Sequence, residues 1–291
     1  MNRQLRGGIL AALGGATLLI AAILPARLAA LFEPAAADLA LSGRLVQGGW
    51  ARGIAPGDAL SLSFDGKPVA LAADRHFFLA FDRDAAPVAQ LRIRRASGSE
   101  ALQQLAIAPR AWQIEHIPLG PRPGTLPNEA FRIRREAELA RIGAARAISA
   151  KSDGWRQNFI WPVTGRLSGH FGSQRIYNGT PGAYHSGLDI ATGASGTPFV
   201  APADGMVILA AHSPFTLEGR LLMIDHGMGL NSAFLHCSQI VVKEGDMVHR
   251  GQFIGRIGMT GRATGPHLHW SIKWQDRRLD PLLFAGTMSG G

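Results

Sequence analysis

The sequence predicts a mainly β protein with a sheet domain toward each end and one helix between them. Its 291 residues include 36 glycines and 17 prolines, which is typical of many turns that join short strands. Runs of alternating apolar and polar residues recur at a spacing of roughly ten residues. The chain is 46% hydrophobic, which is enough for two small domains that each bury a core.

Residues 1–37 are typical of an export segment. Arg3 and Arg6 precede an uncharged run at residues 7–24, and the alanines at 35–37 fit a cleavage site. The run is long for a signal peptide and barely long enough to span a bilayer, so a cleaved signal and an inner-membrane anchor both stay open. Either form predicts a location in the periplasm or cell envelope. The single cysteine, Cys237, excludes both an N-terminal lipid attachment and an intrachain disulfide.

Residues 38–115 are predicted to form a small β-sandwich. Leu60, Leu62 and Phe64 alternate with serines and end at Asp65-Gly66, which is a hairpin signal. Similar alternation follows at residues 77–81 and 91–94, and this succession of short strands predicts an Ig-like sandwich. No titratable cluster stands out in it. Binding of a substrate or partner, and a spacer that orients the rest of the chain, are both open as its role.

Residues 116–155 are predicted to be a linker followed by a helix. Four prolines lie within residues 118–127, and a helix is expected from Asn128 to Ala150, capped by Thr125 or Asn128. Its apolar stripe is Leu139, Ile142, Ala145 and Ile148, and five arginines occupy much of the rest: Arg132, Arg134, Arg135, Arg141 and Arg146. A helix that docks one domain on the other is favoured over one that contacts anionic lipid or cell wall.

The formal charge of +9 favours anionic partners. The chain has no zinc-finger spacing and no other recognisable nucleic-acid module, so nucleic acid is not expected as a partner. An acidic cell envelope is the more economical partner, although a merely solvated basic surface explains the charge equally well.

Residues 156–288 hold two histidine motifs, His185-Ser-Gly-Leu-Asp189 and Gly-Pro-His267-Leu-His269. Residues two apart on a strand share a face, so His267 and His269 project together. On a straight strand His185 and Asp189 would lie roughly 13 Å apart, too far for one ion, so the chain must bend at Ser186-Gly187. Imidazoles with one carboxylate are a usual zinc set that leaves a position for water. Together the motifs predict a Zn²⁺ site.

These motifs belong to a longer series that resembles the lysostaphin-type (LytM-like) zinc metallopeptidases, which cut peptidoglycan cross-bridges. The matching stretches, all between Trp161 and Phe284, are Pro162–Gly172, His185–Ala191, Ala201–Gly205, Ile224–Gly227, Phe234–His236, Val242–Asp246 with Gly251-Gln252, and Thr260–Arg262 with Gly265–Trp270. By this resemblance His185, Asp189 and His269 are the zinc ligands, and His236 and His267 are catalytic. Cys237 and His170 are unusual for the family but lie outside the motif chemistry. The resemblance implies an antiparallel β-sheet metallopeptidase domain with lipoyl-like hairpins.

The function predicted is a zinc-dependent endopeptidase that hydrolyses peptidoglycan stem-peptide cross-links. No HExxH glutamate is present, so His236 and His267 are the available acid–base and oxyanion groups. A D-alanyl–diaminopimelate bond is favoured over a glycine bridge, because the export segment, the absence of wall-binding repeats and the composition resemble a Gram-negative envelope protein. Specificity is expected from loops near Tyr177, Asn178, Phe215 and Trp274.

Three alternatives stay open at this point. A catalytically silent regulator that activates other wall hydrolases is disfavoured, because all five site residues are present. A lipoyl- or biotinyl-carrier module is disfavoured because Lys243 lacks the exposed turn that a carrier lysine needs. A cysteine peptidase using Cys237 and His236 is the weakest, because adjacent strand residues face opposite sides.

Overall fold

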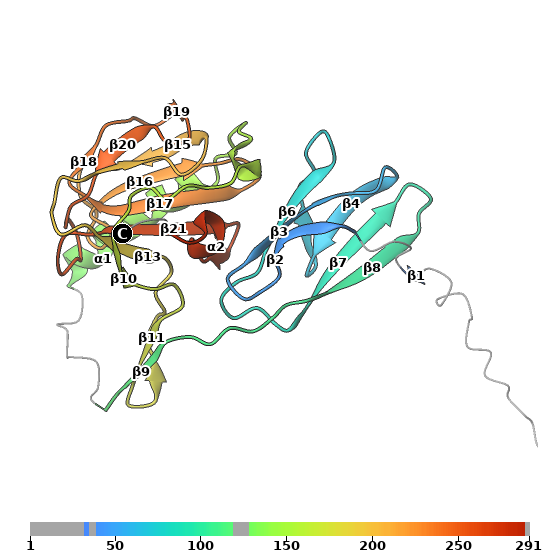
Figure 1. The fold of residues 1–291 in the computed structure, drawn as a ribbon, viewed down its shortest axis with the longest axis horizontal. Helices are drawn as coiled ribbons and strands as arrows, with labels where there is room; N and C mark the ends of the chain where they lie inside the picture. Colours follow the sequence, from blue (N-terminus) through green and yellow to red (C-terminus); the bar gives the residue numbers. More distant parts are fainter. Residues whose placement is uncertain (1–31, 35–38, 119–127, 289–291) are drawn as a thin grey trace, which may run out of the picture.

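The computed structural model describes residues 32–34, 39–118 and 128–288, and these residues are mainly β (Figure 1). The prediction of a mainly β fold with antiparallel sheets is confirmed. Most of the export segment and of the proline-rich stretch lies outside the described residues. Among the described residues, no helix is both long and apolar enough to cross a membrane.

The first part of the chain forms two sheets that share a hydrophobic core (Figure 1, blue to green). One sheet has the order β1 (Phe32–Pro34), β8 (Glu100–Ala106), β7 (Val88–Arg95), β4 (Ala59–Phe64) and β5 (Lys67–Val69). The other has the order β2 (Leu41–Arg44), β3 (Trp50–Ile54) and β6 (His76–Ala80). The Ig-like relation and the domain limits at 38–115 stay predictions.

The hairpin signal at Asp65-Gly66 is confirmed, because β4 pairs with β5 across it. Both turn residues have positive φ, 48° at Asp65 and 78° at Gly66, as a tight hairpin turn requires. The expected alternation of β4 is only partly right. Leu62 and Phe64 are buried, but Leu60 is 63% exposed, because a register shift between Ala59 and Ser61 turns it outward.

Strand β6 departs from the alternation that the sequence predicts, because residues 77–81 are all buried. Phe77 and Phe81 join the core between the two sheets, while Phe78 lies against the C-terminal part of the chain. The ring centroids of Phe78 and Trp274 are 6.0 Å apart, and those of Trp50 and Phe284 are 5.2 Å apart. A second apolar layer thus covers the face that an isolated sandwich would expose to water.

The C-terminal part is built on a large antiparallel sheet (Figure 1, yellow to red). Its order is β10 (Arg166–Gly169), β13 (Leu188–Ala191), β21 (Leu268–Trp274), β17 (Leu230–Cys237), β16 (Arg220–Asp225), β15 (Gly205–Ala210) and β19 (Met247–Val248), with β22 (Arg277–Leu279) paired to β21. A three-stranded sheet has the order β14 (Pro198–Val200), β20 (Phe253–Arg256) and β18 (Gln239–Ile240), and a short helix α2 (Leu282–Ala285) follows β22.

A third small sheet connects the two parts of the chain. Strand β9 (Ile114–Ile117) pairs in parallel with β11 (Gln174–Tyr177), which pairs with β12 (Thr180–Pro181). Just before β9, the indole of Trp112 lies against Gly172, where a Cβ atom would be only 2.2 Å from Trp112 Cε3. The chain leaving the first two sheets therefore packs against the segment that precedes β11.

Helix α1 (Glu129–Arg146) begins at Asn128, whose side chain accepts a hydrogen bond from Phe131 N. The predicted apolar stripe is only partly right, because Leu139 is 51% exposed and Ile148, beyond the helix end, is 43% exposed. Ala145 is buried instead, in a cluster with Met223 and Ala233 of the large sheet. The other buried residue is Glu138, and its carboxylate accepts hydrogen bonds from Thr216 N and Oγ1. The helix thus docks by polar as well as apolar contacts.

His226 is fully buried in the turn between β16 and β17, which fits a structural role rather than a substrate contact. Its Nδ1 lies 2.7 Å from Asp204 O and its Nε2 lies 2.8 Å from Ser232 Oγ. Because a carbonyl can only accept, Nδ1 carries the proton and Nε2 accepts from Ser232. This neutral form is the one the fold selects, and burial lowers the pKa of His226 to about 4.

We therefore expect His226 to destabilise the fold in mild acid. The unfolded imidazole takes up a proton near pH 6.5 while the folded one resists to about pH 4. The contribution of neutral His226 to the free energy of unfolding is thus complete above pH 6.5 and about 2 kcal/mol smaller at pH 5. Burial raises the pKa of the neighbouring Asp225, which acts in the opposite direction. Urea unfolding can be measured at pH 7 and pH 5 in the presence of a metal chelator. Between these pH values the free energy of unfolding should fall less in His226→Gln than in the wild type, and an equal fall would contradict this assignment.

Candidate metal centre

Strands β13 and β21 hold a carboxylate opposite an imidazole. Asp189 and His269 are direct partners in the antiparallel register, so their side chains lie on the same face of the large sheet. Asp189 Oδ1 is 2.9 Å from His269 Nδ1. Gly169 on the neighbouring strand β10 leaves room for this carboxylate, because a Cβ atom there would lie 2.4 Å from Asp189 Oδ2.

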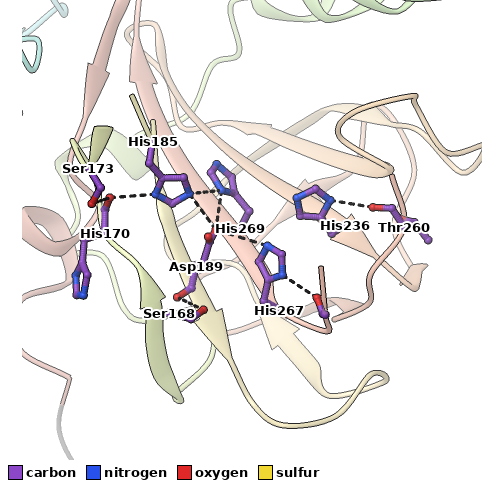
Figure 2. A network of polar contacts seen from close by, with 10 residues as sticks. Ser168, His170, Ser173, His185, Asp189, His236, Thr260, His267 and His269 are labelled. Carbon is purple, nitrogen blue, oxygen red and sulfur yellow. Dashed lines mark hydrogen bonds and ion pairs between the residues drawn. The ribbon is translucent and has the colours of Figure 1, made fainter. Parts of the chain in front are cut away.

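His185 reaches the same point from the loop before β13. Its Nε2 is 3.1 Å from Asp189 Oδ1 and 3.1 Å from His269 Nδ1 (Figure 2). The chain bends between His185 and Asp189, as the spacing requires. Gly187 permits the bend, because a Cβ atom there would lie 2.4 Å from Trp270 O and 2.8 Å from His269 Nε2. Any side chain at this position would displace the histidine or the strand.

The donors of His185, Asp189 and His269 suit a zinc ion. Their atoms lie within 4.8 Å of one another, and the three closest pairs are 2.9–3.1 Å apart. Ligands bound tetrahedrally to zinc at about 2.0–2.1 Å lie roughly 3.3 Å apart. His185 Nδ1 donates to His170 O at 3.1 Å, so in the neutral ring Nε2 is unprotonated and can bind a metal. The residues present therefore fit the ion that the sequence predicts.

The charge on Asp189 is favoured by its neighbours. Burial alone would raise the pKa of this carboxyl, but its interactions with His185 and His269 hold it well below its usual range. Burial alone would lower the pKa of His185, but Asp189 in turn raises it. Burial lowers the pKa of His269, against the pull of Asp189, and so favours a neutral imidazole there. An anionic carboxylate beside a neutral imidazole is the protonation state that metal ligation needs.

His236 and His267 lie beside these three residues and face the same point (Figure 2). His236 Nδ1 donates to Thr260 O at 2.8 Å, and His267 Nδ1 donates to Gly265 O at 2.9 Å. Both Nε2 atoms are therefore unprotonated when the rings are neutral. The two ring centroids are 4.9 Å apart, and His267 Nε2 is 3.6 Å from Asp189 Oδ1. All five residues that the sequence singles out thus converge.

His236 is held in an unusual backbone conformation. Its φ of 64° lies in the left-handed region, which residues other than glycine rarely adopt. Its backbone N donates to Glu218 O at 2.8 Å. The Glu218 carboxylate is paired with Arg135 of helix α1, which also contacts Glu138. Helix α1 therefore braces the segment that fixes His236, and burial lowers the pKa of His236 to about 4.

Cys237 takes no part in this arrangement. Its side chain is fully buried, with Sγ toward Phe234 O, and burial raises the thiol pKa to about 12. A buried, protonated thiol cannot serve as a nucleophile, so the cysteine-peptidase alternative is wrong.

Two of the residues that mark the loops expected to set specificity have buried side chains, and the role of those loops stays a prediction. Phe215 is 5% exposed in the cluster beneath helix α1, and Trp274 is 2% exposed with its Nε1 donating to Met228 O. The sequence did not predict the hydrogen-bond acceptors that orient the rings of His236 and His267. Thr260 and Gly265 act through backbone carbonyls, which leave no side-chain signature in a sequence.

Two imidazoles and a carboxylate that converge on one sheet face are typical of the open zinc sites of metallopeptidases. The model of peptidase family M23 matches residues 183–281. The crystal structure of a candidate M23 peptidase from Pseudomonas aeruginosa is similar over 84% of this chain and 96% of that one, with 31% identity and a TM-score of 0.63. The chain belongs to peptidase family M23.

Two curated relatives match the C-terminal part. Peptidoglycan DD-endopeptidase ShyA of Vibrio cholerae is 41% identical over 108 residues, which are 37% of this chain and 24% of that protein. Murein hydrolase activator NlpD of Salmonella typhimurium is 32% identical over 138 residues, which are 47% of this chain and 33% of that protein. The chain thus spans about a quarter to a third of the length of these relatives.

Proposed function

We propose that this chain is a zinc-dependent endopeptidase that hydrolyses the peptide cross-links of peptidoglycan. The observation that carries the proposal is the convergence of His185, Asp189 and His269 with two further imidazoles, His236 and His267, whose Nε2 atoms are free. The likeness to a DD-endopeptidase supports the substrate class. A D-alanyl–diaminopimelate bond is the proposed target.

In this proposal His185, Asp189 and His269 hold the zinc. Bound zinc would supply a Lewis acid that polarises the scissile carbonyl and lowers the pKa of a water molecule. His236 and His267 each accept a proton at Nε2, because their Nδ1 protons are engaged by Thr260 O and Gly265 O. One can take the proton of the attacking water, and the resulting imidazolium can donate it to the leaving nitrogen. The other, once its Nε2 has taken up a proton from solvent, can donate a hydrogen bond to the developing oxyanion.

We place this activity in the periplasm or cell envelope, where residues 1–37 would direct the chain as a cleaved signal or an inner-membrane anchor. The basic charge of the whole chain, +9, supports an anionic envelope partner over a neutral one. The sandwich at 38–115 is proposed to orient the peptidase domain at 156–288, because Phe78 and Trp50 pack on Trp274 and Phe284. A fusion of residues 1–40 to a reporter that is active only outside the cytoplasm tests the placement, and a silent reporter would refute it.

Digestion of purified sacculi tests the activity. The zinc-loaded protein should release muropeptides whose new termini, identified by mass spectrometry, are a D-alanine carboxylate and a diaminopimelate amine. New termini within glycine bridges would overturn the proposed bond, and no release would overturn the hydrolase.

A second candidate is an activator of other wall hydrolases, favoured by the likeness to NlpD. In this case the protein alone would leave sacculi intact but would stimulate a purified wall amidase. The presence of all five site residues favours hydrolysis.

A further inference from the structure

Three cationic side chains, those of Lys273, Arg278 and Arg146, gather on the face of the large sheet that carries the candidate metal centre. His269, Ser271 and Lys273 alternate along β21, and the register with β17 runs without a shift from Leu235↔His269 to Leu230↔Trp274. The side chains of His269, Ser271 and Lys273 therefore project from one face of the sheet. Lys273 lies roughly 13 Å from His269 along the strand, at about 3.3 Å per residue.

The neighbours of Lys273 on this face are Arg278 and Asn231. Arg278 is its direct partner on β22, and Asn231 is its direct partner on β17. The Arg278 guanidinium lies over the ring of Tyr184, at 5.4 Å from the centroid, and Tyr184 directly precedes His185. The cations are thus connected to the metal-site loop by a packed side chain.

Arg146 joins this group from the last turn of helix α1. The helix covers the same face, because Ala145 packs with Ala233, the neighbour of Ser271. Arg146 Nη1 is 3.5 Å from Asn231 Oδ1. Burial, followed by the repulsion of the nearby Arg278, lowers the pKa of Arg146 to about 10. Burial likewise lowers the pKa of Lys273, followed by the repulsion of Arg146 and Arg278.

No carboxylate neutralises this group by direct contact. Among residues 39–118 and 128–288, none of the three cations has a carboxylate oxygen within 4.0 Å of its side-chain nitrogens. Acids near this group are engaged elsewhere. Asp225 accepts hydrogen bonds from Asn231 Nδ2 and from Ala150 N. Asp82 accepts from Tyr184 Oη and from Arg278 N, and Asp276 pairs with Lys67. Isolated surface cations are ordinarily solvated, but Lys273 and Arg146 are both partly buried and repel one another.

We propose that Arg146, Lys273 and Arg278 form a subsite for a carboxylate of the peptide substrate. The inference rests on the proposed hydrolysis of stem peptides. A peptide laid along the sheet at about 3.3 Å per residue would place this carboxylate three to four residues from the scissile bond. Two guanidinium groups and an ammonium suit a carboxylate, because charge-assisted hydrogen bonds are the strong ones and the arginine fork matches two oxygens.

Two synthetic cross-linked stem peptides test the subsite. They are identical except that the stem carboxylates are free in one and amidated in the other. For Lys273→Met and Arg278→Gln we expect kcat/KM on the free acid to fall by roughly 10-fold or more, mainly through KM. On the amidated peptide the variants should stay within about twofold of the wild type. Lys151→Met, at an exposed lysine that is not one of the three cations, is the matched control and should change neither rate.

The outcomes separate the subsite from folding and from the proposed function. Lys273→Arg should restore the preference for the free acid, and unchanged zinc content and Tm should accompany each variant. Equal losses on both peptides, or a wild type without preference, would overturn the subsite. If the wild type cleaves neither peptide, the proposed function fails. Calorimetric titration of the same peptides then decides the subsite alone, since equal affinity of wild type and Lys273→Met for the free acid overturns it.

Discussion

Asp189→Ala is expected to lose zinc affinity by several orders of magnitude and to lose hydrolysis with it. Asp189 is the only anionic donor of the three, and its Oδ1 lies within 3.1 Å of both candidate imidazole ligands. Two neutral imidazoles alone bind zinc far more weakly, because the carboxylate supplies both charge and a ligand atom. Metal analysis after dialysis should find an occupied wild type and a largely empty variant.

The matched control for this experiment is Asp74→Ala. Asp74 also lies beside a histidine, with its Oδ2 at 3.1 Å from His76 Nδ1, but at the surface of the first part of the chain. Its removal should leave the zinc content unchanged. Equal zinc in the wild type and in Asp189→Ala would refute the ligand assignment, whatever the effect on activity.

Within each histidine motif the arrangement follows from local rules that the sequence displays, whereas the set of three ligands and the roles of His236 and His267 came from the family resemblance. His267 and His269 share a strand face because side chains alternate with a period of two. His185 and Asp189 meet because Gly187 allows the chain to bend close over Trp270 O. Each of these features depends on a few consecutive residues, so a single sequence is enough to predict it.

Features that depend on distant segments were missed, for one physical reason. The burial of Glu138 requires Thr216 and Arg135 to satisfy its carboxylate, and no periodicity of the helix reports that contact. Both faces of β6 are buried because Phe78 packs on Trp274 of the C-terminal part. The cationic group likewise combines residues of β21, β22 and α1, whose proximity is a property of the register and of helix docking.

His267→Ala and His236→Ala are expected to keep zinc and lose activity, whereas His269→Ala should lose both. His269 Nδ1 lies at the point where His185 and Asp189 converge, but His267 Nε2 is 3.6 Å from Asp189 and His236 contacts no candidate ligand atom directly. Loss of one acid–base or oxyanion group should reduce kcat by roughly 10²–10⁴-fold. Zinc analysis and single-turnover kinetics on a cross-linked stem peptide measure the two properties separately.

The backbone at position 236 requires a second variant. At φ 64° alanine is strained, whereas asparagine tolerates the left-handed region. His236→Asn should therefore keep the fold and the zinc while it loses the imidazole, and its activity should fall as far as that of His236→Ala. The decisive result concerns His267. A site in which His185, Asp189, His267 and His269 all bind the metal would be closed, with no position for water. If His267→Ala empties the centre as completely as His269→Ala does, the zinc is structural, because a four-ligand site leaves the proposed hydrolysis without its nucleophile.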